Sequence, residues 1–400
     1  MIESLHEINP GDYLLLLLDG TPFEGMMQRH QQIMTRLARR IRVLYQEESA
    51  SFLSYLLKPR FPIARAFAYK KGVRELAPNL WHIFSPPGFP ERMGLRRVNH
   101  HNHLLAYHHL APHIARFGGE LILWVAHPKA VELVEHIGGA LTIYDCYDAF
   151  GDFPEERWKA AETKRMEIEL LRKADLVLAS AKSLVETRSK FNSNIHLIPN
   201  GADTVHFQRR MSKPIKRYNP DIAEIKRPIV GYMGDIASWL DVESLEKCVK
   251  AMPDVSFVFL GTIKRDIESL RSRPNVHFFG RVDYGDLPYF LAHFDVCTIP
   301  FLVNEMTVHV NPIKVYEYMA TGLPIVSSNL PEVREFGDLI YFYDNPDEYI
   351  TRISNALFER KSDSVLPERR KKESLANSWD ARTEKIWSLI NESLVKIAMK

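Results

Sequence analysis

Tyr13-Leu14-Leu15-Leu16-Leu17-Leu18 begins a pattern that repeats along almost the whole chain: a short apolar run, a loop, and a charged helical segment such as 24–39 or 155–173. A continuous apolar run indicates a strand covered on both faces. Alternation of strands and helices predicts a parallel sheet with right-handed crossovers. Further runs in the first half lie at 41–45, 80–84, 121–125, 141–144, 176–179 and 195–198. The first half is therefore predicted to be a doubly wound α/β domain.

The pattern stops between residues 206 and 227, which are polar, basic and interrupted by prolines, as in a linker. It then restarts, with apolar runs at 229–233, 255–260, 276–279, 296–299, 325–328 and 339–342. We expect an N-terminal domain over 1–205, a linker over 206–227 and a second Rossmann-like domain over 228–378, facing each other across a cleft. Ligands of open α/β sheets bind beyond the carboxyl ends of the strands, so the loops that follow the strands are the candidate sites.

The composition is that of a globular chain of 400 residues, with 46% hydrophobic and 26% charged residues. Lys and Arg number 52 against 50 Asp and Glu, which gives no overall tendency to bind nucleic acid. The three cysteines, Cys146, Cys248 and Cys297, form no C-x-x-C pair, as expected for reduced thiols. No apolar run approaches the roughly 18 residues of a membrane span. We therefore expect a soluble, cytoplasmic chain.

The segment Asn311-Pro312-Ile313-Lys314-Val315-Tyr316-Glu317 is the most specific in the second half. Asn311 is a favourable N-cap and Pro312 suits the first helical position, so a helix is expected to begin here and to end at Gly322. Lys314 would lie in the first turn, where a cation is locally unfavourable unless a phosphate is bound. Glu317, one turn later, could accept hydrogen bonds from a ribose. A surface Lys–Glu pair is the equal alternative.

Glycine and polar residues also stand where predicted strands end. The loop 231–235, with Gly234 and Asp235, follows the first strand of the second domain, and glycine lets N–H groups approach a phosphate closely. A plain tight turn is the favoured alternative, because the spacing fits neither a dinucleotide fingerprint nor a P-loop. In the first domain His127, Asp145 and Asp148 follow strands. A histidine there could contact a sugar hydroxyl, although each residue singly is more often structural.

Two further clusters invite a binding interpretation. The histidines around residues 99–109 match no zinc signature and have no cysteine or carboxylate partners, so we expect a solvated helix face and no metal. A basic run lies beside the apolar residues Ile33 and Leu37 and could contact anionic lipid; its members are Arg36, Arg39, Arg40 and Arg42. A solvated face is the alternative.

Taken together, these segments are similar to glycosyltransferases of the two-domain GT-B fold, family four, over nearly the whole chain. Residues 22–30 resemble the acceptor-side loop and first helix of that family, and 198–207 resemble its "PNGVD…F" motif. The donor-domain signature follows in order at Gly280, 287–291, Asp295, 300–301, Pro312, Lys314, Glu317, Tyr318, Ala320, Gly322 and Pro324. Residues 378–380 resemble the start of the C-terminal helix, 379–400, that returns to the first domain. The subgroup that the chain resembles is that of polysaccharide and teichuronic acid biosynthesis glycosyltransferases.

The resemblance implies that the second domain binds a nucleoside-diphosphate sugar, UDP- or GDP-linked, with no other cofactor, and that the first binds the acceptor. Glu317 is similar to the second Glu of the family's E-x-x-x-x-x-x-x-E motif, which binds the ribose. Lys314 would neutralise the diphosphate, and His127 would lie near the donor sugar. The other implied donor-side residues are Gly234, Asp235, Thr307, His309, Asn311 and Pro312. The implied acceptor-side residues are Glu24, Gly25, Arg29, Asp145 and Asp148.

Two positions depart from the family pattern. The first Glu of the motif falls at His309, and Asp235 replaces the usual Arg after the glycine-containing loop. The Lys that normally follows is absent from residues 237–240. The diphosphate would then depend on Lys314, on helix N–H groups, and on Thr307 or Arg281. Glu305 and His309 are the candidates to replace the missing Glu.

The combined expectation is a retaining, metal-independent hexosyltransferase that acts on a growing, lipid-linked polysaccharide, in the cytoplasm or peripherally at the inner face of the plasma membrane. Retention is implied by the family alone. Two alternatives stay open: a nucleotide-sugar epimerase on the same fold, and a catalytically inactive, sugar-binding partner of a polysaccharide assembly machine. A dehydrogenase is disfavoured, because no predicted strand is followed by G-x-G-x-x-G.

Overall fold

The computed structural model describes residues 8–25, 27–57, 63–90, 96–150, 157–209, 215, 218, 221–362 and 364–399. The chain divides into two compact units, Met1–Pro199 with Arg382–Lys400, and Asn200–Ala381. This division lies a few residues before the predicted boundary at residue 205, and the predicted linker, 206–227, falls within the second unit. Residues 210–214, 216–217 and 219–220 of that linker, and residues 155–156 of the predicted helix 155–173, lie outside the described part of the chain.

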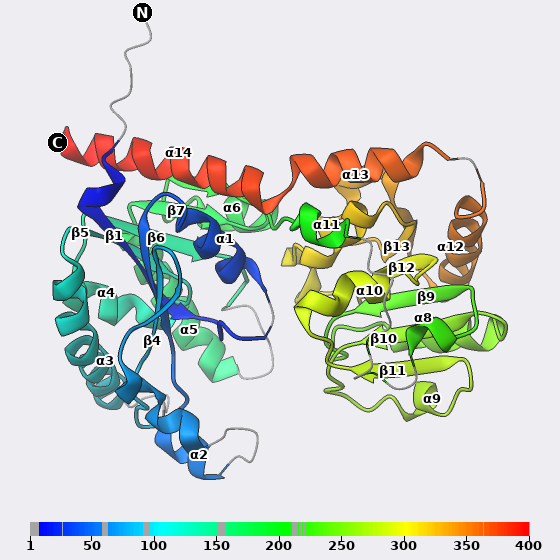
Figure 1. Cartoon of the computed structure of the whole chain (residues 1–400), viewed down its shortest axis with the longest axis horizontal. Helices are drawn as coiled ribbons and strands as arrows, with labels where there is room; N and C mark the ends of the chain where they lie inside the picture. The colour runs from blue at the N-terminus through cyan, green and yellow to red at the C-terminus, as the bar shows by residue number, and fades with distance from the viewer. Residues whose placement is uncertain are drawn as a thin grey trace, which may run out of the picture. The chain divides into compact units, whose positions relative to one another are not determined.

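The first unit contains an eight-stranded sheet in the order β3-β4-β2-β1-β5-β6-β7-β8 (Figure 1). Its strands are β1 (Tyr13–Gly20), β2 (Arg42–Glu47), β3 (Arg74–Ala77), β4 (Leu80–Phe84), β5 (Glu120–Val125), β6 (Leu141–Cys146), β7 (Leu176–Ala179) and β8 (Ile195–Leu197). The pair β3–β4 is antiparallel and the other neighbouring pairs are parallel. The five leucines at 14–18 are fully buried. The apolar run is therefore a central strand covered on both faces, as predicted.

The helices of the first unit are α1 (Arg29–Leu37), α2 (Phe52–Leu57), α3 (Arg96–Phe117), α4 (Val131–Ile137), α5 (Arg157–Lys173) and α6 (Lys182–Arg188), with short 3-10 turns η1 (Pro10–Asp12), η2 (Ile63–Lys71) and η3 (Pro128–Ala130). The first helix begins at Arg29, later than the predicted Glu24, because Gln28 and Gln31 form a capping box there. The C-terminal helix α14 (Trp379–Ala398) lies along this unit in Figure 1. Its Glu384 accepts a hydrogen bond from Arg40 (2.6 Å), and Lys385 donates to the Leu197 carbonyl (3.1 Å).

The second unit contains a six-stranded parallel sheet in the order β11-β10-β9-β12-β13-β14. Its strands are β9 (Ile229–Met233), β10 (Ser256–Leu260), β11 (Val276–Gly280), β12 (Val296–Ile299), β13 (Ile325–Ser328) and β14 (Tyr341–Tyr343). The first strand, β9, lies between β10 and β12, so the sheet grows outward in both directions from it. This order produces a topological switch point at the carboxyl ends of β9 and β12.

The helices of the second unit are α7 (Thr204–Phe207), α8 (Val242–Ala251), α9 (Glu268–Arg271), α10 (Leu287–Leu291), α11 (Ile313–Thr321), α12 (Pro346–Glu359) and α13 (Leu366–Ala376), with 3-10 turns η5 (Ile222–Glu224), η6 (Tyr284–Asp286), η7 (Thr307–His309) and η8 (Arg334–Leu339). The helix α11 follows the turn η7 directly. Gly322 ends α11 in the left-handed conformation (φ 78°), as predicted.

The prediction that Asn311 caps α11 and that Pro312 is its first residue is wrong. Pro312 is extended and stands before the first helical residue, Ile313, with no side-chain cap. The Asn311 side chain is used elsewhere: its oxygen accepts from the Asn200 N–H (2.9 Å) and its amide donates to the Tyr316 hydroxyl (3.0 Å). Because Asn200 also donates to the Asn311 carbonyl (2.6 Å), these contacts tie the start of the second unit to the segment before α11.

Candidate functional site

The candidate site of the second unit lies at the switch point between β9 and β12. Gly234 and Asp235 follow β9, and Phe301 follows β12. In an open α/β sheet this position offers backbone groups from two neighbouring loops to one ligand. The loop after β9, which the sequence alone left as a tight turn or a phosphate loop, is therefore placed at the preferred ligand position of the fold.

Lys314 reaches this position from the first turn of α11. Its Nζ lies 4.5 Å from the centre of the Phe301 ring and 5.3 Å from the centre of the Tyr232 ring. A β-carbon built on Gly234 would lie 3.2 Å from the same Nζ, so the loop passes close to the ammonium. Within the described residues the ammonium makes no hydrogen bond or ion pair. Two aromatic faces and the positive end of α11 surround a cation that has no anionic partner, which is an arrangement suited to binding an anion.

Glu317 follows Lys314 by one turn on α11, and the residue is only 6% exposed. Its carboxylate has no hydrogen-bond or ion-pair partner among the described residues. Burial raises the pKa of Glu317 to about 8, and the nearby Lys314 opposes this rise. Burial likewise lowers the pKa of Lys314 to about 8, opposed by Glu317 and Asp235. A buried carboxylate without donors is costly, and hydroxyl groups of a ligand would supply the missing hydrogen bonds.

Two glycines shape the loop beside Lys314. Gly234 has a positive φ of 139°, and its N–H donates to the Leu260 carbonyl (2.8 Å). Gly261, with φ 156°, comes so close that a β-carbon there would lie 1.9 Å from the Gly234 carbonyl oxygen. Any side chain at residue 261 would displace this loop. The close packing of the two loops therefore positions Gly234 against the Lys314 side chain.

Asp235 is paired with a cation that the sequence reasoning missed. The Lys264 ammonium donates to Asp235 Oδ2 (2.6 Å), and the backbone carbonyl of Asp235 accepts from the Tyr232 hydroxyl (2.9 Å). Lys264 follows the strand β10, which is the neighbour of β9 in the sheet. A lysine shortly after the apolar run at 255–260 was the available signal. The ion pair with Asp235 therefore holds Lys264 at this loop, at the position where the family pattern has an arginine.

Thr307 and His309 lie in η7, just before α11. Thr307 is buried, and its hydroxyl bonds the Leu302 carbonyl and the Asn304 N–H, so its contact with the diphosphate stays a prediction. His309 is half-buried, and its Nδ1 is fully buried without a hydrogen-bond partner in the described structure. Glu305, the other candidate to replace the missing Glu, is exposed. An unsatisfied buried nitrogen favours His309 as the residue that awaits a ligand.

In the first unit, Arg29 and Asp145 form a buried ion pair rather than an acceptor-facing surface. Arg29 Nε donates to both oxygens of Asp145 (3.0 and 3.1 Å), and its NH1 donates to the Ile198 carbonyl (2.9 Å). His30 Nε2 lies 3.3 Å from Asp145 Oδ2. Although burial alone would raise it, the pKa of Asp145 is lowered by Arg29 and His30. Arg29 and Asp145 therefore fix α1 against the end of β6, and their predicted place on the acceptor side stays a prediction.

The other predicted site residues of the first unit are more exposed to solvent than Arg29 and Asp145. His127 is half-buried, accepts the Lys129 N–H (3.2 Å) at the start of η3 and packs on Phe150. Burial, with Lys129, lowers the pKa of His127 to about 3, so the ring is neutral. Burial raises the pKa of Asp148 to about 6. Glu24 is exposed and pairs with Arg74 (2.9 Å), and Gly25 has a φ of 112°.

The arginine run that could have contacted lipid is largely used within the first unit. Arg36 is buried and donates to the Gln32 side chain (2.6 Å), and Arg40 pairs with Glu384. Arg42 donates to the carbonyls of Phe117 (2.6 Å) and Gly11 (2.9 Å). Because Arg36, Arg40 and Arg42 bond to other residues of the first unit, they do not form a free basic face for anionic lipid. None of the helices within the described ranges is long and apolar enough to cross a bilayer.

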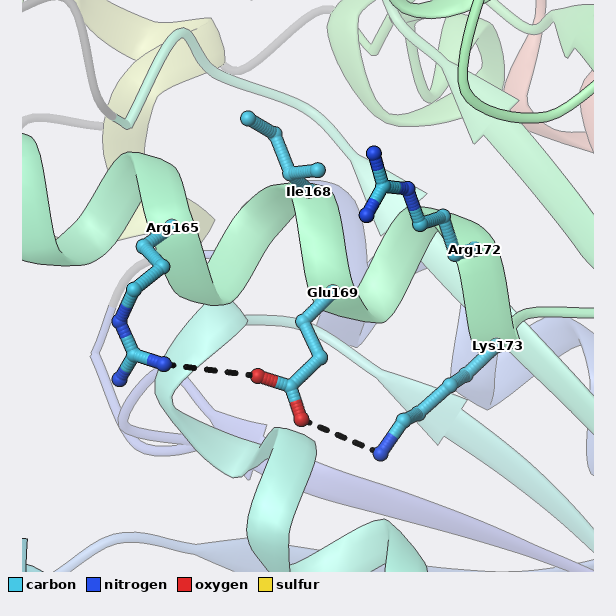
Figure 2. Close-up of a pocket in the computed structure, with 5 residues that line it drawn as sticks. All are labelled: Arg165, Ile168, Glu169, Arg172 and Lys173. Atoms are coloured by element: carbon cyan, nitrogen blue, oxygen red, sulfur yellow. Dashed lines mark hydrogen bonds and ion pairs between the residues drawn. The ribbon is translucent and has the colours of Figure 1, made fainter.

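A hollow of about 280 Å³ lies along α5 (Figure 2). Its Glu169 is flanked by Arg165 (3.8 Å) and Lys173 (3.1 Å), one turn away on either side. Such a ladder is typical of a solvated helix face.

The histidine run at 99–109 lies on α3, and there His103 Nδ1 lies 3.2 Å from the carboxylate of Glu132, so the expectation of no carboxylate partner is wrong. In the part of the chain that the structure describes, no group of three or more His, Cys, Asp or Glu side chains could hold a metal.

Comparisons with known proteins show which families and folds this chain resembles. Residues 227–358 match the family model described as glycosyl transferases group 1. The second unit carries a glycosyl transferases group 1 domain. This match contains the loop after β9, Lys264, Lys314 and Glu317. The matched range does not include the first unit, so the similarity to the family model is limited to the second unit.

Curated relatives extend the similarity. TuaH of Bacillus subtilis, named as a teichuronic acid biosynthesis glycosyltransferase, is 23% identical over 282 residues, which cover 66% of this chain and 70% of TuaH. The sulfoquinovosyl transferase SQD2 of Arabidopsis thaliana is 25% identical over 232 residues, which cover 54% of this chain and 44% of SQD2.

Solved structures resemble nearly the whole chain. An E. coli structure described as trehalose-6-phosphate bound with UDP-2-fluoro glucose has a TM-score of 0.69 at 11% identity and covers 95% of this chain and 99% of its own. Anabaena Alr3699/HepE in complex with UDP and glucose has a TM-score of 0.65 at 13% identity, with coverage of 95% and 99%. Identities this low establish the fold alone, which is the predicted GT-B fold with Rossmann-like domains.

Proposed function

We propose that this chain is a glycosyltransferase that moves a sugar from a UDP-sugar to an acceptor hydroxyl, with the donor bound by the second unit and the acceptor by the first. The Lys314 ammonium, held at the switch point without an anionic partner, is the observation on which this proposal rests. The group 1 domain and the UDP named in the HepE structure support the choice of donor.

Each residue near Lys314 has a role in this proposal. Lys314 and the loop at Gly234 bind the diphosphate, because N–H groups and a nearby cation favour its charge. Glu317 accepts hydrogen bonds from the ribose hydroxyls, which supply the donors that its carboxylate lacks in the described structure. Lys264 turns from Asp235 to the diphosphate when donor binds. His309 Nδ1, which lacks a partner, contacts the donor in place of the missing Glu.

The proposed reaction retains the anomeric configuration and needs no metal. The bond between C1 of the sugar and the diphosphate oxygen breaks, and the acceptor oxygen bonds to C1 on the same face. The acceptor proton passes to the departing diphosphate. Lys314 stabilises the developing negative charge, an effect that typically contributes several kcal/mol to catalysis. The transferred sugar is proposed to be a hexose.

The proposed acceptor is a growing polysaccharide, carried on a lipid at the inner face of the plasma membrane. The name of TuaH, which refers to teichuronic acid biosynthesis, supports a cell-envelope glycan as the acceptor class. Within the first unit, Asp148 is a half-buried group at a strand end that is available to an acceptor.

A thermal-shift comparison of UDP, GDP, ADP and dTDP, with wild type and Lys314→Ala, tests the donor assignment. A ligand that binds only the folded chain raises its melting temperature. We expect stabilisation by UDP that is lost in the variant. Stabilisation by another diphosphate would change the assigned base, and no stabilisation by any would contradict the donor site.

A second experiment separates transfer from the alternatives. The enzyme is incubated with a UDP-hexose, with and without a glycan acceptor, and UDP release is measured. Acceptor-dependent release supports the transferase. Conversion of the donor to an epimer without UDP release would favour the epimerase. Glycan binding without donor turnover would favour an inactive sugar-binding partner, an alternative for which the Asp235 carboxylate in the donor loop is the specific observation.

A further inference from the structure

The first unit contains an apolar pocket of about 790 Å³ that the proposed donor and acceptor residues do not use. It lies among α2, η2, the loop at 85–90 and α3. Its apolar lining includes Phe52, Leu53, Phe67, Phe89 and Leu105. We call this region the α2–η2 surface.

The pocket is built by specific contacts. The Phe52 N–H donates to the Gly88 carbonyl (3.0 Å), which joins α2 to the loop at 85–90. The Asn102 side chain on α3 bonds both the N–H (2.8 Å) and the carbonyl (2.9 Å) of Phe89. The Tyr69 ring of η2 packs edge-on against His109 of α3, with centres 5.7 Å apart. These contacts hold four segments around one hollow.

Apolar side chains also project from the rim of the pocket. Leu57 is 69% exposed and Phe89 is 58% exposed. Of the sixteen large hydrophobic residues that are exposed in the described part of the chain, eight belong to this region: Phe52, Leu53, Leu56, Leu57, Ile63, Phe67, Phe89 and Leu105. Soluble monomers seldom gather so many on one side, and such a patch usually marks a protein or membrane contact.

The charge of the same segments indicates what covers them. Among the described residues of these segments, Arg65 pairs with Glu47 and Arg74 pairs with Glu24, whereas Lys70 and Lys71 make no ion pair. In η2, Lys70 and Lys71 are exposed, and the Lys70 ammonium lies 5.2 Å from the Phe67 ring centre. Protruding apolar groups beside exposed lysines that have no acidic partner among the described residues match the hydrocarbon boundary and the phosphates of an anionic bilayer.

We propose that the α2–η2 surface docks the chain on an anionic lipid bilayer, with Phe52, Leu57 and Phe89 entering the headgroup region while Lys70 and Lys71 contact lipid phosphates. This inference builds on the proposed lipid-linked acceptor, and it replaces the run at Arg36–Arg42 as the membrane contact. It places the first unit, which is the proposed acceptor-binding unit, at the surface where a lipid-linked acceptor would be found.

Vesicle co-sedimentation of the full chain tests this surface. Vesicles of phosphatidylcholine alone are compared with vesicles of equal parts phosphatidylglycerol and phosphatidylcholine. We expect binding to the anionic vesicles that weakens as salt rises. The double variant Leu56→Glu/Leu57→Glu should reduce binding at least about tenfold, because both apolar side chains are exposed and would no longer enter the bilayer. Lys70→Glu/Lys71→Glu should also reduce it.

Phe358→Glu/Val365→Glu is the matched control. Phe358 and Val365 are 77% and 73% exposed in the second unit, so this double variant adds the same two charges elsewhere and should bind as wild type does. Melting temperatures of all variants check that each is folded. Equal vesicle binding by wild type and Leu56→Glu/Leu57→Glu, or equal binding to neutral and anionic vesicles, would overturn the proposal.

Absence of vesicle binding would also overturn it. If the wild-type chain self-associates in sedimentation velocity and the leucine variant does not, the surface is a protein interface instead. UDP binding is measured separately on the same samples. Vesicle binding without UDP binding would reject the proposed donor site but support this surface. UDP binding without vesicle binding would reject this surface alone.

Discussion

Lys314 and Glu317 lie one turn apart on α11, and neither forms an ion pair or hydrogen bond within the described residues. Burial lowers the pKa of the lysine and raises that of the glutamate, each to about 8. A pair that served only stability would close into a salt bridge. An acidic and a basic side chain that are desolvated but left apart are better explained by a ligand that uses both, which a diphosphate and a ribose would do.

Replacing Glu317 by Gln should stabilise the ligand-free chain. Because the folded-state pKa of Glu317 is raised from 4.5 to about 8, the folded chain keeps a proton that the unfolded chain loses, and stability falls as pH rises through this interval. The variant should therefore melt a few degrees higher than wild type at pH 8 and above, with little difference near pH 4. Thermal unfolding across pH checks this.

The same Glu317→Gln variant should bind UDP about tenfold more weakly, because a neutral amide accepts hydrogen bonds less strongly than a carboxylate. Glu243→Gln is the control, since Glu243 is an exposed acid on α8. A Glu317→Gln chain that is no more stable at pH 8 and binds UDP as wild type does would contradict the proposed role.

The affinity for UDP should fall as pH rises above about 8. Lys314 binds a diphosphate in its protonated form, and burial lowers its pKa to about 8, so protons must be taken up on binding at higher pH. Titrations between pH 7 and pH 9 should show this decline in wild type. The variant Lys314→Met should bind weakly and lose the decline, and a persistent pH dependence in it would assign the effect to another group.

Asp145→Asn should destabilise the first unit strongly. Removing one charge of the buried pair with Arg29 leaves the other without compensation, which typically costs about 3–5 kcal/mol. Urea unfolding measures the change in the free energy of unfolding. Asp338→Asn is the comparison, because Asp338 forms an exposed pair with Arg369 and its loss should change little. A small effect of Asp145→Asn would mean that the pair contributes little to stability.

Gly261→Ala should disturb the donor loop. At a φ of 156° an alanine is strained, and its β-carbon would lie 1.9 Å from the Gly234 carbonyl oxygen. We expect a loss of stability of more than about 1 kcal/mol, together with weaker UDP binding. Gly285→Ala, where a β-carbon would meet no atom within 4 Å, should leave both unchanged. Unaltered UDP binding in Gly261→Ala would show that the loop position is not required.

Much of the fold was predictable because its signals are local. The buried leucines at 14–18 and Gly322 at the end of α11 follow from short stretches of sequence. Lys314 was identified from its place in the first turn of the expected helix. The parallel direction of neighbouring strands, in all described pairs except β3–β4, follows from the alternation of apolar runs and helices. Each of these inferences needs only a few neighbouring residues.

Contacts between distant residues could not be predicted in this way. Asn311 bonds Asn200, which lies 111 residues earlier, instead of capping α11. Asp145 looks like an exposed strand-end acid until Arg29, 116 residues away, is seen to bury it. Lys264 reaches Asp235 only because β10 is the neighbour of β9.

Calorimetric titration of UDP tests whether Lys314 holds a diphosphate at the switch point. The chains compared are wild type, Lys314→Ala and Lys226→Ala, in which Lys226 is an exposed lysine paired with Asp254. We predict that wild type and Lys226→Ala bind UDP alike, and that Lys314→Ala binds at least about tenfold more weakly, as expected for the loss of a charge-assisted contact. Equal binding by Lys314→Ala and wild type would contradict the proposed donor site.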